Sequence, residues 1–252
     1  MPRLLRNSAA LIALLLAAAC NGNAAEQAPQ PAEDVVTGGT GEETPLGLFT
    51  TLPIYWGEAA DIASILDEQG EAGWVRQTLE NARELQPLDA LEEDSLAGMT
   101  DIVLAQPRPL APSENVAFDA WLRNGGQALI FADPMLTQHS DYPLGDPRRP
   151  HDMVVLSPLF THWNLRLVFD EEQPEGEREV DGVPIDLAGR FEIDSPGDES
   201  FCDLSAGGLI ADCRIGDGRA VLVADAALLD DHHRDRTRED VLNRLLERSF
   251  GI

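Results

Sequence analysis

Two aspartates end short apolar runs in this chain of 252 residues. Asp133 follows the run 128–132, and Asp225 follows the run 219–224. Such runs are typical of strands buried on both faces, and open α/β sheets hold their ligands at the carboxyl ends of the strands. Two carboxylates in one crevice could bind a cation or raise each other's pKa. The alternative is that Asp133 only ends a strand and Asp225 only caps a turn, as Asp commonly does.

Three further side chains are expected beside this crevice. Arg108 follows the apolar run 102–105, and Tyr55 and Trp56 follow the first expected strand, at 46–52. Large aromatic side chains dominate many protein interfaces, so Tyr55 and Trp56 are candidates for contact with a partner. Burial of the aromatic pair in the core is the alternative. We expect neither a cofactor nor a metal-ligand set here.

Composition and motifs exclude several kinds of catalysis. All 18 basic residues are arginines, which rules out Schiff-base chemistry, a P-loop lysine and a Ser–Lys dyad. No Gly-x-Ser-x-Gly elbow occurs. The run 230–235 holds two adjacent histidines that could bind a transition metal. Adjacent histidines seldom converge on one ion, so a solvated loop is the expected structure.

The stretch 98–134 predicts the elements that would position these side chains. It reads as a strand at 102–105, a helix that begins with Ser113 as N-cap and ends at Gly125-Gly126, and a strand at 128–132. A crossover this short is nearly always right-handed and joins parallel strands. The sequence therefore predicts a mostly parallel sheet covered by helices.

Other elements follow from apolar spacing along the rest of the chain. Helices are expected at 58–69, 74–84, 154–163 (which Pro158 breaks or restarts) and 238–250, and further strands at 85–88, 165–169, 183–188, 190–193 and 219–224. The strands at 183–188 and 190–193 alternate as half-exposed antiparallel strands do. The loop 135–152 is long enough to be functional or disordered.

Two segments carry a family resemblance. The run TDIVLAQPRPLAPSENVAFDAWLRNGGQALIFADP (100–134) resembles the extracytoplasmic domain of auxiliary ABC-transporter proteins of the gliding-motility type. That domain is related to the intraflagellar-transport (GIFT) domain and, more distantly, to class I glutamine amidotransferases. The run GDGRAVLVADAALLDD (216–231) is similar to the family's late strand. The resemblance spans about 46–250 and implies a Rossmann-like (flavodoxin/amidotransferase-like) three-layer α/β fold, here with an antiparallel hairpin extension.

The catalytic elbow of the amidotransferases is absent. That chemistry needs a thiolate on a tight turn after a strand, with a histidine base nearby. The central strands are followed here by Gln106-Pro107 and Asp133-Pro134, with no cysteine at either place. Amidotransferase activity is therefore not expected.

The N-terminal residues predict export and attachment to a membrane. Residues 1–20 form a basic and then apolar leader that is too short to span a bilayer. Ala17-Ala18-Ala19-Cys20 resembles a bacterial lipobox, in which Cys20 would carry the lipid; ordinary signal-peptidase cleavage is the alternative. By resemblance to lipoprotein sorting rules, Asn21 favours the outer membrane. Residues 21–45 predict a disordered tether, and 46–252 a single α/β domain.

The charge argues against nucleic-acid partners, and the cysteines agree with export. Without the two leader arginines, 16 basic residues stand against 45 acidic ones, a formal charge of −29 that repels nucleic acid. Cys202 and Cys213 are equidistant from Gly207-Gly208, a hairpin-turn signal, so they would lie opposite each other and form a disulfide. A catalytic or metal-binding pair is the alternative, but the close cysteine spacing of zinc sites is missing.

Together these observations predict a non-catalytic, membrane-tethered periplasmic binding or scaffold domain. The resemblance implies a protein partner in an ABC transport system. The alternative is a hydrolase or metal-dependent enzyme that uses an Asp133/Asp225 crevice. An enzyme needs titratable groups that converge in a concave pocket, whereas an apolar crevice favours a protein partner.

Overall fold

The computed structural model describes residues 44–58, 72–194 and 200–252. The leader with Cys20, nearly all of the tether, and all but the first residue of the helix expected at 58–69 lie outside the described residues. Within the described ranges, no helix has the length and apolar character that crossing a membrane requires.

Seven strands form the main sheet. Their order is β2 (Leu85–Pro87), β1 (Leu46–Thr50), β3 (Asp101–Ala105), β4 (Gln127–Phe131), β11 (Gly218–Val223), β10 (Ile210–Ile215) and β9 (Ser200–Ser205). The five strands from β2 to β11 are parallel, and β10 and β9 extend the sheet as an antiparallel hairpin. The parallel strands follow the flavodoxin-like order 2-1-3-4-5, with β11 as the fifth. The expected fold class is confirmed.

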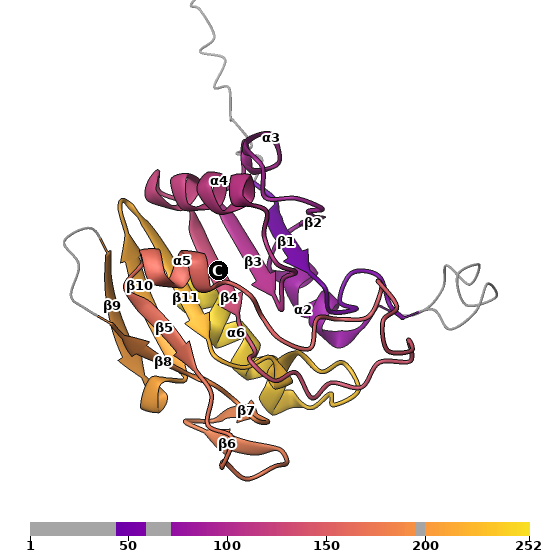
Figure 1. The fold of residues 1–252 in the computed structure, drawn as a ribbon. Coiled ribbons are helices and arrows are strands. Elements are labelled where there is room, and N and C mark those ends of the chain that lie inside the picture. The colour runs from indigo at the N-terminus through magenta and orange to yellow at the C-terminus, as the bar shows by residue number, and fades with distance from the viewer. Residues whose placement is uncertain (1–43, 59–71, 195–199) are drawn as a thin grey trace, which may run out of the picture. The chain divides into compact units, whose positions relative to one another are not determined.

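Helices cover both faces of this sheet. They are α2 (Trp74–Ala82), α3 (Glu93–Leu96), α4 (Pro112–Arg123), α5 (Ser157–His162) and α6 (Arg236–Phe250). In Figure 1, α4 and α5 lie in front of the sheet, and α6 lies behind it together with α2, which it contacts. Strands β3 and β4 are consequently buried on both faces, which explains why they read as uninterrupted apolar runs.

Three helix starts differ from expectation. Helix α4 begins at Pro112, not after Ser113, because the Glu114 carboxylate accepts the N–H of Ala111 (2.8 Å) and so satisfies a free donor before the helix. Helix α5 starts at Ser157 and not at 154, with Pro158 in its first turn, so the helix begins at this proline, which is one of the two outcomes expected there. Helix α6 begins two residues early, because the side chain of Asp235 accepts the N–H of Arg238 (2.8 Å).

Two small sheets pack beside the main one. Strand β5 (Leu165–Val168) pairs with β8 (Arg190–Ile193), and β6 (Arg178–Val180), which was not expected, pairs with β7 (Val183–Ile185). Strand β8 alternates between exposed and buried, as expected. The half-exposed prediction is wrong for β7: its three residues are all buried, because the strand packs against α6 and the turn at 227–229.

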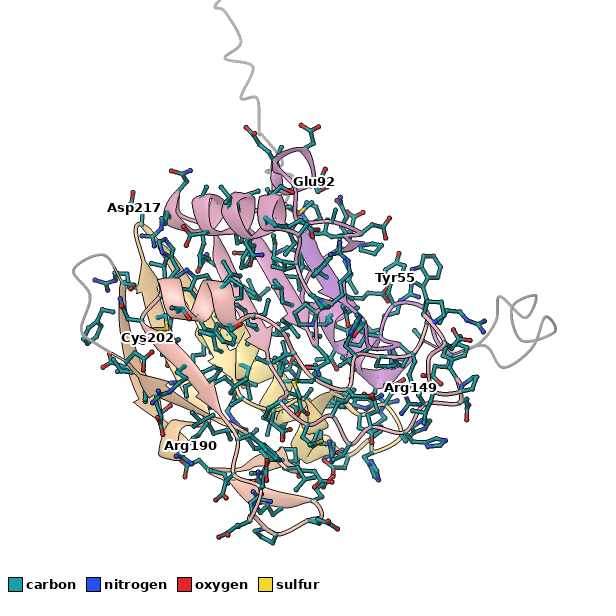
Figure 2. All side chains as sticks on the ribbon, in the orientation of Figure 1. Tyr55, Glu92, Arg149, Arg190, Cys202 and Asp217 are labelled. Atoms are coloured by element: carbon teal, nitrogen blue, oxygen red, sulfur yellow. A yellow bond between two sulfur atoms is a disulfide. The ribbon has the colours of Figure 1, made fainter. Side chains whose placement is uncertain are left out.

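The predicted disulfide between Cys202 and Cys213 is confirmed. The two cysteines lie directly opposite in the β9–β10 hairpin, in the region labelled Cys202 in Figure 2. Both turn glycines have a positive φ, +67° at Gly207 and +92° at Gly208. Residues that carry a side chain rarely adopt this backbone conformation. A Cβ on Gly208 would also lie 2.8 Å from the carbonyl oxygen of Phe191.

Candidate functional site

Asp133 and Asp225 follow neighbouring parallel strands, β4 and β11, and both are almost completely buried. The Asp133 carboxylate accepts the N–H of Met135 at Oδ1 (2.8 Å) and the N–H of Ala226 at Oδ2 (3.1 Å). Each of these contacts fixes the backbone directly after a strand.

Asp225 plays a similar part on the neighbouring strand. Its Oδ1 accepts the N–H of Ala227 (2.6 Å), and its Oδ2 accepts the N–H of Asp186 (3.0 Å). The turn-capping alternative therefore describes the hydrogen bonds that both carboxylates make.

Burial changes the ionisation of this pair. Burial is the main cause that raises the pKa of Asp133 to about 7, and the charge of nearby Asp186 raises it further. The hydrogen bonds from the backbone N–H groups of Met135 and Ala226 act in the opposite direction and lower the pKa. Burial and then the charge of Asp133 raise the pKa of Asp225 well above its ordinary value. Raised carboxyl pKa values occur at active sites and also in structural networks. Acid–base catalysis requires contact with a substrate, and these side chains have almost no accessible surface.

Gln106 joins the same region, a role that sequence reasoning missed. Its side chain pairs with the backbone of Asp133, since Oε1 accepts the N–H (3.0 Å) and Nε2 donates to the carbonyl (3.1 Å). Nε2 also donates to the carbonyl of His151 (2.8 Å). Gln106 is buried with φ +45°, so it links the ends of β3 and β4 to the loop 135–152. A polar side chain directly after a buried apolar strand was the available signal.

Arg108 is engaged with a buried carboxylate. Its guanidinium forms two hydrogen bonds of 2.8 Å to Glu114 and lies 5.0 Å from the centre of the Phe49 ring. Glu114 also accepts the backbone N–H groups of Ala111 and Leu91. The hydrogen bond from Arg108 is the main cause that lowers the pKa of Glu114 to about 2. Arg108 therefore holds the start of α4 in place.

Tyr55 and Trp56 lie apart from the two aspartates. The Tyr55 ring is partly buried beneath the guanidinium of Arg76 (4.3 Å) and meets the Trp56 ring edge-on (4.8 Å). Trp56 is 75% exposed. Both residues line a cavity whose lining includes neither Asp133, Asp225 nor Arg108. The structure therefore does not gather the five candidates in one open crevice.

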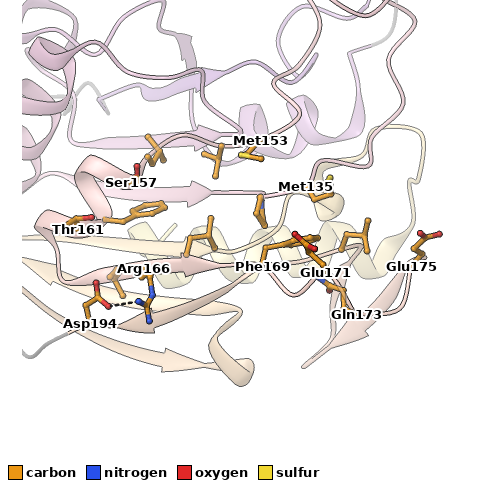
Figure 3. Close-up of a pocket in the computed structure, with 17 residues that line it drawn as sticks. Met135, Met153, Ser157, Thr161, Arg166, Phe169, Glu171, Gln173, Glu175 and Asp194 are labelled. Atoms are coloured by element: carbon orange, nitrogen blue, oxygen red, sulfur yellow. Dashed lines mark ion pairs between the residues drawn. The ribbon is translucent and has the colours of Figure 1, made fainter.

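An open apolar groove with a volume of about 680 Å³ lies between α5 and β5 (Figure 3). Its lining includes the buried side chains of Leu156, Phe160 and Leu165. Met135 and Met153, which are 40% and 57% exposed, also line it. Methionine side chains are flexible and suit surfaces that adapt to a partner.

Acidic side chains stand among the polar residues of this groove. Glu171, Glu175 and Asp194 all contribute to its lining. Arg166, the basic residue in the lining, forms ion pairs with Asp194 (3.4 Å, dashed in Figure 3) and with Glu192 (2.7 Å). The polar lining is thus net negative and suits a ligand with an apolar body and basic flanks.

The described residues contain no group of three or more His, Cys, Asp or Glu side chains that could hold a metal ion. Of the adjacent histidines, His233 pairs through Nδ1 with Asp230 (2.8 Å). Its side chain is exposed, as in the solvated loop expected there.

Comparison with known proteins finds weak structural likenesses. No family model and no curated protein matches the sequence. The exo-β-1,4-mannosidase Op5Man5 from Opitutaceae bacterium strain TAV5 is 13% identical, with 81% of this chain and 33% of that chain covered and a TM-score of 0.38. A β-galactosidase from Rahnella sp. R3 is 11% identical over 82% of this chain and 31% of that chain, with a TM-score of 0.44.

A ThuA-like protein from Bacteroides uniformis is 12% identical over 83% of this chain and 95% of that chain, with a TM-score of 0.41. The chain spans about a third of the length of the two glycosidases. At these identities and TM-scores, the likenesses do not bear on function.

Proposed function

We propose that this chain is a non-catalytic periplasmic binding or scaffold domain, an auxiliary component of an ABC transport system. Lipid on Cys20 holds it at a membrane, and Asn21 favours the outer membrane. The groove between α5 and β5 receives an apolar segment of a protein partner. The observation that supports this proposal best is the groove itself, which is open, has a volume of about 680 Å³ and is lined by apolar side chains that include exposed methionines.

Charge supports a specific chemistry for the partner. Without its leader the chain carries a formal charge of −29, and Glu171, Glu175 and Asp194 place part of this negative charge in the lining of the groove. An apolar segment flanked by arginine or lysine would bury its apolar side chains in the groove and set its basic ends beside these carboxylates. Complementary charge of this kind steers association and suppresses wrong partners.

The competing enzymatic proposal depended on Asp133 and Asp225. Their four carboxylate oxygens all accept backbone N–H groups, and both side chains are buried. The contacts of this pair thus support a structural role and give the hydrolase or metal-dependent alternative no favouring observation.

The proposal is tested by changing the groove and comparing capture of partners from envelope membranes. Met153→Glu places a negative charge on its apolar surface and should reduce capture of ABC-transporter subunits at least about tenfold, a loss of about 1.4 kcal/mol. Val116→Glu is the matched control, because Val116 is an exposed apolar residue on α4 outside the groove. Equal capture by both variants, or capture of proteins unrelated to ABC transport, would contradict the proposal.

A further inference from the structure

Strand β5 has a free edge along the apolar groove. Within the described part of the chain, β5 pairs only with β8, in a two-stranded sheet. Three consecutive residues of β5, Leu165, Arg166 and Leu167, line the groove, whereas none of the four residues of β8 does. Successive side chains of a strand point to opposite faces of its sheet. A hollow lined by three consecutive residues therefore runs along the edge of β5, on the side away from β8.

The register of β5 and β8 decides which backbone groups face this edge. The N–H of Asp194 donates to the carbonyl of Asn164 (2.9 Å), directly before the first pair of the ladder. Hydrogen-bonded and non-hydrogen-bonded pairs alternate along an antiparallel ladder. Leu167 and its partner Phe191 therefore form a non-hydrogen-bonded pair. The N–H and C=O of Leu167 consequently point away from β8, toward the free edge.

The accessible part of this edge lies at Leu167 and Phe169. Both residues line the groove and are partly exposed, and their backbone groups make no hydrogen bond within the described ranges. The register turns the backbone of Leu165 the same way, but Leu165 is only 1% exposed. Free N–H and C=O groups at a strand edge are a template for a further strand. A helix does not satisfy them, because its own backbone groups are bonded internally.

Charge and apolar contacts favour a particular side-chain pattern in the added strand. The groove offers apolar contacts at Met153 and Phe160 and carboxylates at Glu171 and Glu175. Because the side chains of a strand alternate, one set can meet the apolar contacts while the other set meets the carboxylates. An extended segment that alternates apolar residues with arginine or lysine fits both.

Two other occupants fit the groove poorly. Residues 21–45 of this chain hold five acidic residues and no basic one, so their charge is wrong for the groove. A second copy of the chain, with a formal charge of −29 without its leader, is repelled for the same reason. The charge therefore favours a different protein as the source of the strand.

We propose that the partner segment binds in extended form, as a third strand beside β5, with apolar side chains alternating with arginine or lysine. In strand addition of this kind, backbone hydrogen bonds give affinity and the alternating side chains give specificity. The inference rests on the function proposed above, since it assigns a conformation and a side-chain pattern to the segment that the groove receives.

The test is a calorimetric titration of the purified soluble chain with a synthetic peptide of about eight residues that alternates valine with arginine. Saturable one-to-one binding is expected, with a Kd of about 100 μM or tighter. Two further peptides carry N-methyl groups on the valines or on the arginines, which removes the N–H donors of one edge of the strand and keeps every side chain. One of these peptides should bind at least about tenfold more weakly, and the other within about twofold of the parent.

A pair of variants tests the same contact from the side of β5. Leu167→Pro removes the free N–H without breaking a hydrogen bond to β8, and an edge strand tolerates proline at such a position. Leu167→Ala is the matched control, because it shortens the side chain and keeps the N–H. The proline variant should bind the parent peptide at least about tenfold more weakly than the alanine variant does. The methylated peptides test this contact in the unchanged chain.

Three results would overturn the inference. They are the absence of saturation up to about 1 mM peptide, equal binding of the two methylated peptides, and tighter binding of a valine–arginine peptide whose apolar residues have helical spacing. Failure of the proposed function gives a different result. If the strand peptide binds but Met153→Glu leaves capture of ABC-transporter subunits unchanged, only the role in transport is refuted. If capture depends on Met153 but no strand peptide binds, only the strand conformation is refuted.

Discussion

Asp133 accepts the backbone N–H of Ala226 at 3.1 Å, a bond that joins the segments that follow two neighbouring parallel strands, β4 and β11. The carbonyl of Asp133 also accepts the N–H of Val154 (2.9 Å), and Val154 lines the apolar groove. The aspartate that first suggested catalysis thus helps to position the wall of the groove.

Asp133→Asn should make stability less dependent on pH. The pKa of Asp133 is raised from 3.8 to about 7 in the folded protein, so its contribution to stability is complete below about pH 4 and is lost as the pH rises through 7. The asparagine side chain at position 133 of the variant does not ionise in this pH range. Its unfolding free energy relative to wild type should therefore increase from pH 4.5 to 8, by at most about 1.4 kcal/mol per pH unit. Urea denaturation across this range measures the difference, and a constant difference contradicts the raised pKa.

Arg108→Met should destabilise the protein by about 2–3 kcal/mol at pH 7, because it leaves the buried Glu114 carboxylate without its main partner. The folded-state pKa of Glu114 is lowered from 4.5 to about 2, so the stabilisation by this pair is present above pH 4.5 and lost as the pH falls through 2. The deficit of the variant should therefore shrink in acid.

Arg166→Met is the control for this prediction, because it breaks ion pairs that are mostly exposed. It should cost less than about 1 kcal/mol. If urea denaturation shows equal losses of unfolding free energy for both variants, the Arg108–Glu114 pair contributes no more to stability than an exposed ion pair does.

Reduction of the Cys202–Cys213 disulfide should lower the unfolding free energy by about 1–3 kcal/mol. The bond joins residues 11 positions apart, and the flanking hairpin already limits part of the freedom that reduction restores. Denaturation with and without a reducing agent measures the change. Two reactive thiols at these positions in the unfolded, unreduced protein would show that the bond does not form.

Cys20→Ser should abolish incorporation of labelled fatty acid and release the protein into the soluble periplasmic fraction. The reason is that lipid on Cys20 is the proposed membrane anchor. Absence of label in the wild-type protein would instead indicate a soluble exported protein.

The main sheet was predictable because its signals are local. The apolar runs that form β3, β4 and β11 are buried on both faces. Cys202 and Cys213 are equally far from the turn glycines Gly207-Gly208, so the turn predicts that they lie opposite each other in the hairpin. The engagement of Arg108 was not predictable, because no periodic pattern joins a loop arginine to the first turn of the following helix.

The groove was not predictable for a related reason. Met153 and Phe169 line it together only because the chain turns from α5 into β5, which pairs with β8 in a separate small sheet. The local apolar pattern indicates burial and does not show which partly exposed side chains will meet across a gap.

The most direct test of the proposed function is site-specific photocrosslinking in intact envelopes. A benzophenone amino acid replaces Met153 in the groove or, as a matched control, Val116 on α4. We predict that the groove position crosslinks to a subunit of an ABC transporter, through an apolar segment flanked by arginine or lysine, and that the control position does not. Equal crosslinking from both positions, or a crosslinked protein that belongs to no ABC transport system, would contradict the account.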